Sequence, residues 1–504
     1  MTKDYKKLKS GSDIRGTAIG NATDLTDQAV ADISYAFALW VAKQNPDKQL
    51  KIAVGHDSRL SADRIKKLVI DMLVQCNTQV YDCGLCSTPS MFMMTKYAET
   101  DCDASIMITA SHHPYDKNGL KFFTKNGGLE SKDIAEILEI AQKYLPTEAA
   151  SKSGGQVIKG DFVGLYCKGL VDKVVTATGR KKPLEGLKIV LDAGNGAGGF
   201  FAERVLDLLG ADTSGSQFLE PDGNFPNHVP NPEDKDAMRS LSKRVVETKA
   251  DLGIIFDTDV DRAAIADSKG NEINRNRLIA LISAILLDNS QCSVLSAQCG
   301  VIVTDSVTSD GLREFIEAKG GRHHRYKRGY KNVINEAIRL NQIGQDAPLA
   351  IETSGHAAFR ENYFLDDGAY LVVRALIKMA ELKQKGLTLT DLIKDLKEPK
   401  EEAEIRLKFV CNDWQDAGSI IIKKLTEYSQ KNLILAPDNH EGVRATVFKA
   451  QGWFLVRMSV HDPIMAINIE SDITGGTKQI AKLLQKLFKE FGHKIDISPI
   501  GDVI

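Results

Sequence analysis

The sequence predicts a multidomain α/β protein, and two observations carry this prediction. With 504 residues, the chain is several times longer than a typical domain, so we expect roughly three to five domains. Along much of it, a short β-branched apolar run is followed by a Gly or Asp turn and then by about ten or more residues of helical periodicity. This alternation is typical of α/β layers with parallel strands.

The order of these signals divides the chain into units. The first contains, or ends at, a surface connection at 149–156, the second begins near Gly186, and the third starts after Asn289. The charged stretch 394–409 is predicted to be a linker, and the alternating pattern after it predicts a smaller α+β unit with antiparallel strands. The strand-to-loop signals lie at 51–59, 104–114, 251–262, 301–309 and 348–359.

Charge and hydropathy exclude several classes of partner. The chain has 65 Lys plus Arg against 67 Asp plus Glu, so its overall charge attracts neither nucleic acid nor an anionic membrane. Its longest apolar stretch, 278–287, is about half the roughly 20 residues that cross a bilayer, and the basic start lacks the apolar core of a secretory signal. We expect a cytoplasmic protein that acts on small molecules.

The loop at 109–114 carries the most informative motif. Ser111 follows an apolar strand and is flanked by small residues and by His112 and His113. We expect it to be exposed at the carboxyl edge of the sheet, where open α/β sheets bind ligands, and to be a candidate nucleophile. The GxSxG pattern of α/β-hydrolases is absent from this loop. A polar turn that satisfies its own backbone explains the segment equally well.

Asp257, Asp259 and Asp261 follow another apolar strand and form a candidate metal site. Alternate carboxylates repel one another unless a cation lies among them, and such hard oxygen donors favour Mg²⁺ or another hard divalent ion. An EF-hand is excluded, because Arg262 and Ser268 occupy the positions that require Gly and Glu.

A haloacid-dehalogenase-type phosphatase is the alternative for this segment. That class presents a nucleophilic aspartate in a DxD after an apolar strand, here Asp257, and 364–368 could supply its second acidic pair. Asp261, however, stands where that class usually has Thr or Val.

Two later loops carry groups that suit a sugar phosphate. Glu352, Ser354 and His356 combine a carboxylate, a hydroxyl and an imidazole that suit sugar hydroxyls, and a polar loop is the alternative. Arg457 and Ser459 place a fixed cation and a hydroxyl two residues apart, which suits a phosphate, and a surface strand end is the alternative.

Two further patterns are weak. Gly194, Gly196 and Gly199 satisfy GxGxxG after a strand, but tight strand-to-helix turns use glycine for backbone reasons alone. Cys83 and Cys86 form a single CxxC without the second pair of a zinc site, so we expect incidental core or loop cysteines.

Taken together and in order, these loops resemble the α-D-phosphohexomutase family, the phosphoglucomutases and phosphomannomutases. The resemblance runs nearly end to end, and the combination of TASHHP with DTDVDR at this separation is specific to that family. Further matching segments are DIRG at 13–16, VGHDSRLSA at 54–62, NGLK at 118–121, GNG at 194–196, PDGNFPNHVPNP at 221–232, ETSGH at 352–356 and RMS at 457–459.

The resemblance implies three related mixed-sheet α/β domains and a smaller C-terminal α+β domain around a central cleft. Their expected ranges are 1–165, 166–287, 288–395 and 396–504, and they contribute the phosphoserine, metal, sugar and phosphate loops in that order.

The resemblance also implies roles for individual residues. Ser111 matches the phosphoserine, and it shares the metal with Asp257, Asp259 and Asp261; Lys121 is a candidate general base or acid. The other implied positions are Arg15, His112, Lys121, Arg262 and Tyr330 near the transferred phosphoryl group, Glu352, Ser354 and His356 at the sugar, and Arg457 and Ser459 at the distal phosphate.

The chain departs from the family pattern at three places. His113 stands where Asn is usual, and Tyr330 stands where many relatives have His. The segment 457–463 reads RMSVHDP where RPSGTEP is usual, so it lacks the glycine and threonine of that phosphate loop.

The implied activity is an isomerase reaction: reversible phosphoryl transfer between C1 and C6 of glucose or mannose phosphate. It proceeds through phosphorylated Ser111 and a hexose 1,6-bisphosphate, with Mg²⁺ as cofactor and the bisphosphate as activator. We expect a monomer or weak dimer. A non-catalytic relative that acts as a binding protein is the second alternative.

Overall fold

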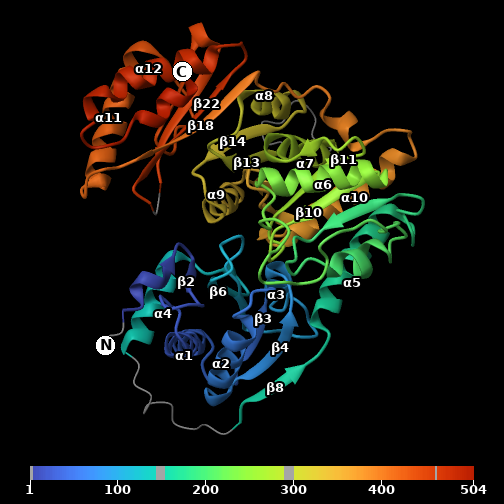
Figure 1. Ribbon diagram of the computed structural model, residues 1–504. Coiled ribbons are helices and arrows are strands. Elements are labelled where there is room, and N and C mark those ends of the chain that lie inside the picture. The colour runs from blue at the N-terminus through green and yellow to red at the C-terminus, as the bar shows by residue number, and fades with distance from the viewer. Residues whose placement is uncertain (1–3, 144–153, 289–299, 460–461) are drawn as a thin grey trace. The chain divides into compact units, whose positions relative to one another are not determined.

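The computed structural model describes most of the chain (Figure 1). Two predicted features fall largely outside the described residues, namely the connection at 149–156 and the start of the third unit after Asn289. The described residues are 4–143, 154–288, 300–459 and 462–504.

The chain forms two compact units. Unit 1 comprises Met1–Leu278 and Ser354–Asp391, and unit 2 comprises Ile279–Thr353 and Leu392–Ile504. Helix α7 (Arg275–Asp288) carries the chain from unit 1 into unit 2.

The first sheet of unit 1 has eight strands in the order β1-β2-β6-β5-β3-β4-β8, with β7 paired to β6. It is mixed, because β3 pairs in parallel with β4 and β5 whereas β6 is antiparallel to β5 and β2. The strands are β1 (Lys9–Ser10), β2 (Asp13–Thr17), β3 (Lys51–His56), β4 (Gln79–Leu85), β5 (Ala104–Ile108), β6 (Lys117–Thr124), β7 (Gly127–Gly128) and β8 (Gln156–Lys159).

Helices cover both faces of this sheet. Neighbouring strand residues point to opposite faces, so Phe122 packs in one core cluster and Phe123 in another. The cluster around Phe122 includes α1, α2 and α4, and the cluster around Phe123 includes α3. The helices are α1 (Asp27–Gln44), α2 (Ala62–Gln75), α3 (Thr88–Met93) and α4 (Ser131–Lys143).

The second sheet of unit 1 has the order β12-β11-β10-β9, and β9 and β10 are parallel. Helix α6 packs on β10, and α10 packs on both β11 and α5 although it comes from late in the chain. The elements are β9 (Ile189–Asp192), β10 (Leu252–Phe256), β11 (Ala263–Asp267), β12 (Glu272–Ile273), α5 (Phe162–Thr178), α6 (Lys235–Thr248) and α10 (Gly368–Lys383).

A third α/β layer begins in unit 2 with three parallel strands in the order β14-β13-β15. Farther along the chain, β16 and β17 pair antiparallel within unit 1. The elements are β13 (Val301–Asp305), α8 (Asp310–Ala318), β14 (Arg322–Tyr326), α9 (Tyr330–Gln342), β15 (Leu349–Ile351), β16 (Ala357–Phe359) and β17 (Leu365–Asp366).

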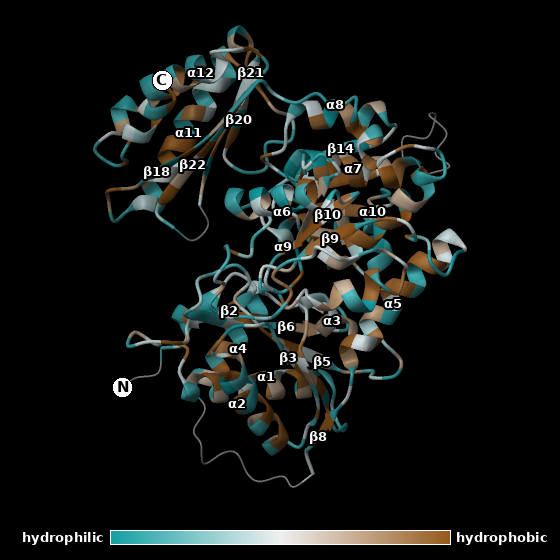
Figure 2. Cartoon of the chain, turned by 45° about the vertical axis from the view of Figure 1, so that its right-hand side comes forward, coloured by the Kyte–Doolittle hydropathy of each residue, from teal (hydrophilic) through white to brown (hydrophobic). Residues whose placement is uncertain are grey.

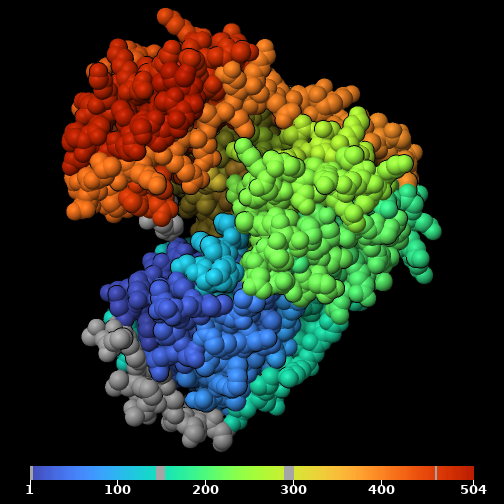
Figure 3. Space-filling model, in the orientation of Figure 1, coloured from blue at the N-terminus to red at the C-terminus, as the bar shows by residue number. Residues whose placement is uncertain are grey.

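The C-terminal part of unit 2 is an antiparallel sheet in the order β18-β22-β21-β20-β19, and its residues form a continuous orange and red body in Figure 3. Helices α11 and α12 share one hydrophobic core with the sheet. The elements are β18 (Glu401–Lys408), α11 (Trp414–Asn432), β19 (Ile434–Leu435), β20 (Val443–Val447), β21 (Gly452–Met458), β22 (Ile464–Ser471) and α12 (Gly476–Phe488).

The predicted linker at 394–409 is wrong over half of its length. Strand β18 occupies 401–408 at the edge of the C-terminal sheet. Charged and apolar residues alternate along this strand: Glu404 and Arg406 are exposed, whereas Ile405 and Leu407 are buried. An edge strand tolerates this charge because one side faces water.

The predicted fold class is confirmed: three α/β domains with mixed sheets are followed by a smaller C-terminal α+β domain. Figure 2 shows hydrophobic residues concentrated in α7 and α10, two helices that are largely buried. Within the described ranges, no helix has both the length and the apolar character needed to cross a membrane.

One buried hydrogen bond joins α5 to the start of α10. The Tyr166 hydroxyl donates to Asp367 Oδ1 at 2.6 Å, and Asp367 caps α10 by accepting from the Tyr370 amide. Burial raises the pKa of Asp367 to about 6, so the tyrosine donor helps this carboxylate to stay ionised in the core.

We expect Tyr166→Phe to destabilise unit 1 by about 1–3 kcal/mol, because a buried carboxylate loses a donor while the aromatic packing is kept. A lower midpoint in urea denaturation followed by tryptophan fluorescence is the readout. Tyr363→Phe is the matched control, since Tyr363 is 55% exposed. Equal midpoints for both variants would contradict the assignment.

Candidate active site

Ser111 lies in the loop between β5 and β6 of unit 1. Its φ of 49° is in the left-handed region, which non-glycine residues seldom adopt. The amide donates to Thr109 Oγ1 at 2.9 Å. We predicted an exposed serine, and this is wrong: Ser111 is 4% exposed, because side chains from the loop between β10 and β11 cover it.

The Ser111 hydroxyl is held by two residues of that second loop. Its Oγ donates to Asp257 Oδ2 at 3.0 Å and accepts from Arg262 Nη2 at 2.8 Å. His112 Nδ1 lies 3.4 Å from the same oxygen. The two most informative sequence motifs, which are more than a hundred residues apart, therefore meet at one atom.

The three aspartates of the β10–β11 loop form a buried cluster. Asp257 and Asp259 are 0% exposed and Asp261 is 3% exposed. One carboxylate oxygen from each lies within 4.8 Å of the others. Val260 between them has a φ of 67°, which is strained for a β-branched residue.

The donor set fits a hard divalent cation. Asp259 Oδ1 and Asp261 Oδ1 are buried without a hydrogen-bond partner among the described residues. Buried carboxylate oxygens are ordinarily paired, so these two orphaned atoms indicate a missing positive ligand. Burial, followed by repulsion from Asp261, raises the pKa of Asp257 well above its usual range, and a cation would relieve both costs.

Arg262 links the aspartate loop to the serine loop. It is 2% exposed, and its Nε donates to Asp257 Oδ2 at 3.1 Å. Its Nη2 also donates to His112 Nδ1, and its Nη1 donates to Asn231 Oδ1 at 3.1 Å. Burial and then the nearby Arg262 charge lower the pKa of His112 to about 2, so this imidazole is neutral.

Lys121 and Arg15 reach the site from neighbouring strands of the first sheet. Lys121 on β6 donates through Nζ to Asp259 Oδ2 at 3.2 Å and to Asp261 Oδ2 at 2.5 Å. Arg15 lies on β2 opposite Gly119 of β6, and its Nη2 donates to Asp13 Oδ2 at 3.0 Å. Its charge also helps to lower the pKa of His112, which places it near that imidazole.

Two residues from the predicted sugar loop lie in unit 1 beside the aspartates. His356 Nε2 is 3.6 Å from Asp261 Oδ1, and its Nδ1 is 2.8 Å from Ser354 Oγ. A backbone bridge between Arg262 and His356 joins the two loops.

The other predicted sugar and phosphoryl residues lie in unit 2. Glu352 follows β15, is 4% exposed, and accepts from the Gly329 amide through Oε1 at 2.6 Å. Tyr330 is the first residue of α9 and directly follows that glycine. The hydrogen bond between the Gly329 amide and the Glu352 carboxylate therefore holds Glu352 and Tyr330 near each other.

Arg457 and Ser459 lie at the end of β21 in unit 2. Arg457 Nε is buried and has no hydrogen-bond partner among the described residues. Burial, followed by repulsion from Arg328, lowers the pKa of Arg457, and two close cations favour an anion between them. Ser459 Oγ accepts from the Asp462 amide at 3.2 Å, and residues 460–461 of the predicted phosphate loop lie outside the described residues.

Sequence reasoning missed Thr88, the first residue of α3. Its hydroxyl donates to Asp259 Oδ2 at 2.5 Å, and its amide donates to the Asp259 carbonyl at 2.8 Å. The two bonds fix both ends of a candidate metal ligand. No local signal identifies Thr88, since the contact spans 171 positions of the chain.

The two weak sequence patterns have structural explanations. A Cβ at Gly196 would lie 2.7 Å from the Thr258 carbonyl oxygen, and one at Gly199 would lie 2.2 Å from that of Leu219, so close backbone packing requires both glycines. Cys83 and Cys86 are buried free thiols in the core beneath α3, and burial raises the pKa of Cys86 to about 12.

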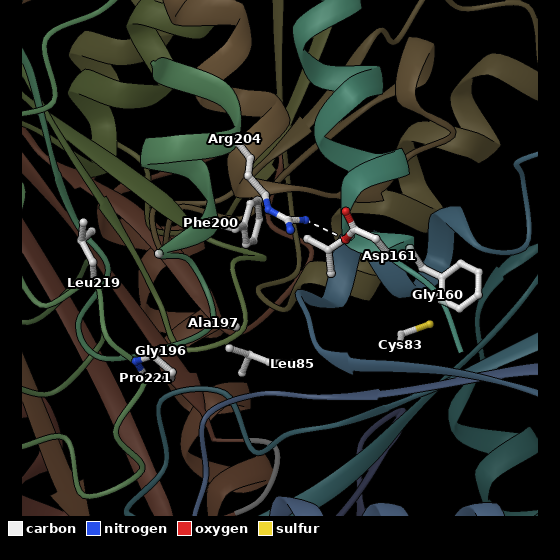
Figure 4. A pocket seen from close by; sticks show the side chains of 13 residues that line it. Cys83, Leu85, Gly160, Asp161, Gly196, Ala197, Phe200, Arg204, Leu219 and Pro221 are labelled. Carbon is white, nitrogen blue, oxygen red and sulfur yellow. Dashed lines mark hydrogen bonds and ion pairs between the residues drawn. The ribbon is translucent and has the colours of Figure 1, made fainter. Parts of the chain in front are cut away.

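A separate pocket of about 250 Å³ lies beside the glycine turn (Figure 4). Its two charged side chains, Asp161 and Arg204, pair with each other at 2.7 Å. The pocket does not include Ser111 or the aspartate cluster.

Comparison with known proteins identifies the relatives of the chain. The family models for phosphoglucomutase/phosphomannomutase alpha/beta/alpha domains I, II and III match 6–148, 165–270 and 274–399. A Pseudomonas putida phosphomannomutase/phosphoglucomutase is 32% identical over 84% of each chain, and a Neisseria gonorrhoeae phosphoglucomutase is 29% identical over 98% of this chain and 99% of its own. A Burkholderia thailandensis phosphoglucomutase/phosphomannomutase family protein superimposes with a TM-score of 0.78 at 25% identity, covering 96% of this chain and 97% of that one.

The orphaned aspartate oxygens predict divalent-cation binding that is measurable without any substrate. We expect the chain to bind one Mn²⁺, a spectroscopic substitute for Mg²⁺, in a titration followed by electron paramagnetic resonance. Asp261→Asn should weaken binding about tenfold or more, because a ligand charge is lost. Asp172→Asn is the control, since Asp172 is exposed on α5 and pairs with Lys168. Unchanged binding by Asp261→Asn would rule the site out.

Proposed function

The chain belongs to the phosphoglucomutase/phosphomannomutase family, and we propose that it transfers a phosphoryl group reversibly between C1 and C6 of a hexose phosphate. The reaction passes through phosphorylated Ser111 and a hexose 1,6-bisphosphate. The observation that carries this proposal is the pair of hydrogen bonds made by the Ser111 hydroxyl. It donates to Asp257 within a buried three-aspartate cluster and accepts from the Arg262 guanidinium.

Ser111, Asp257, Asp259 and Asp261 are the residues we propose to hold the cation, and Mg²⁺ is the ion that suits their hard oxygens. When bound, it would balance the carboxylate charge beside a phosphoserine and withdraw electron density from the phosphoryl group. Arg262 contributes a fixed positive charge at the same oxygen of Ser111. Its planar donors suit the phosphoryl oxygens.

The transfer needs one proton to move as each phosphorus–oxygen bond is made and broken. A sugar hydroxyl attacks the phosphorus in line, and its proton passes to Lys121 in the neutral amine form. The bond to Ser111 Oγ breaks, and its electron pair stays on Oγ beside the Arg262 guanidinium. Ser111 Oγ then takes up one proton and Lys121 releases the one it gained, so that the step is balanced. In the reverse step the Lys121 ammonium returns the proton to the departing sugar oxygen. The structure is compatible with the ammonium form, since Nζ donates to two aspartates.

Residues of the sugar and phosphate loops supply the rest of the proposed substrate contacts. We assign the sugar hydroxyls to Glu352, Ser354 and His356, and the distal phosphate to Arg457 and Ser459. Turning the bisphosphate end over end lets either phosphate reach Ser111, so the distal site has to accept both orientations.

The bisphosphate also serves as activator, because it can phosphorylate Ser111 and still leave as a hexose phosphate. Arg15, His112 and Tyr330 are proposed to lie at the transferred group.

The alternatives are not favoured. As the nucleophile of a haloacid-dehalogenase-type phosphatase, Asp257 would need a free oxygen, but its two oxygens accept from Ser111, the Arg262 amide and Arg262 Nε. A non-catalytic binding protein would have no need for the buried charges that this site retains.

The remaining assignments extend the proposal to the whole chain. We propose domain boundaries near 165/166, 287/288 and 395/396, a cytoplasmic location, and a monomer or weak dimer. Small-molecule hexose phosphates are the proposed partners, and the free buried thiols fit a reducing compartment.

We expect Ser111→Ala to lose mutase turnover by a factor of about 1,000 or more, measured in a coupled assay with glucose 1-phosphate and glucose 1,6-bisphosphate. The acceptor oxygen is absent in this variant, whereas Ser419→Ala, at an exposed position of α11, should match the wild type. Intact mass should show a phosphate on the wild type that resists hydroxylamine. Near-normal turnover by Ser111→Ala, or a hydroxylamine-labile phosphate, would sink the serine mechanism.

The residues assigned to the sugar predict that the enzyme accepts either configuration at C2 of the substrate. Glu352 and Ser354 match positions that hold the 3- and 4-hydroxyls, which glucose and mannose present alike, and none of the residues assigned to the sugar reads C2. A hydroxyl that is not read gives little discrimination. We expect kcat/KM for glucose 1-phosphate and mannose 1-phosphate to agree within about 100-fold, or about 3 kcal/mol.

Galactose 1-phosphate is the informative comparison, because it is inverted at C4 and should be much poorer. Glu352→Gln should narrow the gap between glucose and galactose by weakening the contact that reads C4. Equal use of galactose by the wild type, or complete refusal of mannose, would show that the sugar residues are misassigned.

A further inference from the structure

We propose that Arg59, together with Asp57 and Thr109, forms a clamp that positions the Ser111 loop for phosphoryl transfer. This inference rests on the proposed function, in which Ser111 carries the phosphoryl group. Arg59 does not contact Ser111 Oγ among the described interactions, so we assign it as a positioning residue and not as a catalytic one.

The clamp is a single guanidinium that binds four backbone carbonyls of one loop. Arg59 Nη1 donates to the carbonyls of Pro114 at 2.7 Å and Lys117 at 2.9 Å. Its Nη2 donates to the carbonyls of Ser111 at 2.5 Å and His113 at 2.6 Å. Both ends and the centre of the loop are thereby tied to one side chain.

The loop needs such support because its own conformation is unfavourable. A left-handed backbone is disfavoured at a non-glycine residue, and Ser111 adopts it with a φ of 49°. Two backbone bonds within the loop, from His113 to Ala110 and from Lys117 to Pro114, leave the Ser111 carbonyl to Arg59. Buried carbonyls require a donor, and the planar guanidinium provides donors in several directions at once.

Asp57 and Thr109 fix the clamp from the opposite side. The Arg59 side chain is 0% exposed, with Nε 3.3 Å from Asp57 Oδ2. The Thr109 hydroxyl donates to Asp57 Oδ2 at 2.6 Å and accepts from the Ser111 amide at 2.9 Å. The Ser111 peptide is therefore held at its amide through Thr109 and at its carbonyl through Arg59, which leaves Oγ directed at Asp257.

The clamp predicts a loss of rate without a matching loss of substrate binding. A displacement of the reacting oxygen by about 1 Å can lower the rate about 100-fold. Arg59→Lys retains the charge but cannot bind four carbonyls in two directions. We expect kcat to fall about 100-fold in this variant while KM stays within about threefold of wild type.

The experiment compares the wild type, Arg59→Lys, Thr109→Val and the control Arg64→Lys. Arg64 also donates to a backbone carbonyl, that of Ala18, and pairs with Asp27, but it lies on the partly exposed face of α2. Measurements are kcat, KM, Mn²⁺ binding, and hydrogen–deuterium exchange of peptides that cover 104–124. Arg59→Lys and Thr109→Val should exchange faster in 109–117 and lose kcat, but bind Mn²⁺ normally. Arg64→Lys should match the wild type in all three measurements.

If Arg59→Lys keeps the wild-type kcat, or if hydrogen–deuterium exchange in 109–117 is unchanged in this variant, the clamp is overturned. If Arg59→Lys does not fold by circular dichroism, the same outcomes in Thr109→Val decide the question, because that variant breaks the link between Asp57 and the Ser111 amide. Absence of mutase turnover in the wild type would instead count against the proposed function. In that case loop exchange alone decides whether the clamp holds the serine loop.

Discussion

The buried negative charge of Asp257, Asp259 and Asp261 is the constraint on which the rest of the site depends. Unpaired carboxylates at this depth cost several kcal/mol each, so the fold has to bring positive charge to them. Lys121 arrives from the first sheet and Arg262 from the aspartate loop itself. The interface between the first two α/β layers of unit 1 is thus organised around charge compensation.

The positive side chains compensate only part of the negative charge of the three aspartates. Lys121 donates to Oδ2 of Asp259 and Asp261, and Arg262 and Ser111 donate to Asp257. Oδ1 of Asp259 and Asp261 has no hydrogen-bond partner among the described residues. A site intended for protein cations alone would pair those oxygens too. Two side-chain cations against three carboxylates leave both net negative charge and unused ligand atoms, which is the condition that a divalent ion satisfies.

The sequence predicted those parts of the site in which several functional side chains lie close together in a short segment. Local pattern was enough to predict the strand-to-loop transitions at 104–114 and 251–262 and, within them, the candidate residues Ser111 and Asp257. Apolar runs and clustered carboxylates can be recognised in the sequence without knowledge of the fold. Thr88 escaped detection because its partner lies far along the chain. The burial of Ser111 and the strand at 401–408 were misread for a related reason: exposure depends on which distant segment covers a residue, and an edge strand carries the composition of a linker.

The late segment 354–391 belongs to unit 1 because the aspartate loop needs it. Val260 has an unfavourable left-handed backbone, and its carbonyl accepts from the Gly368 amide at 3.0 Å, at the first residue of α10. A Cβ at Gly368 would lie 2.6 Å from the Arg262 carbonyl carbon, so glycine is required for α10 to approach so closely. The aspartate loop thus takes its strained shape from a helix more than a hundred residues downstream. The serine loop is supported in a different way, by the carbonyl contacts of Arg59, and each strained loop relies on residues outside the motif that defines it.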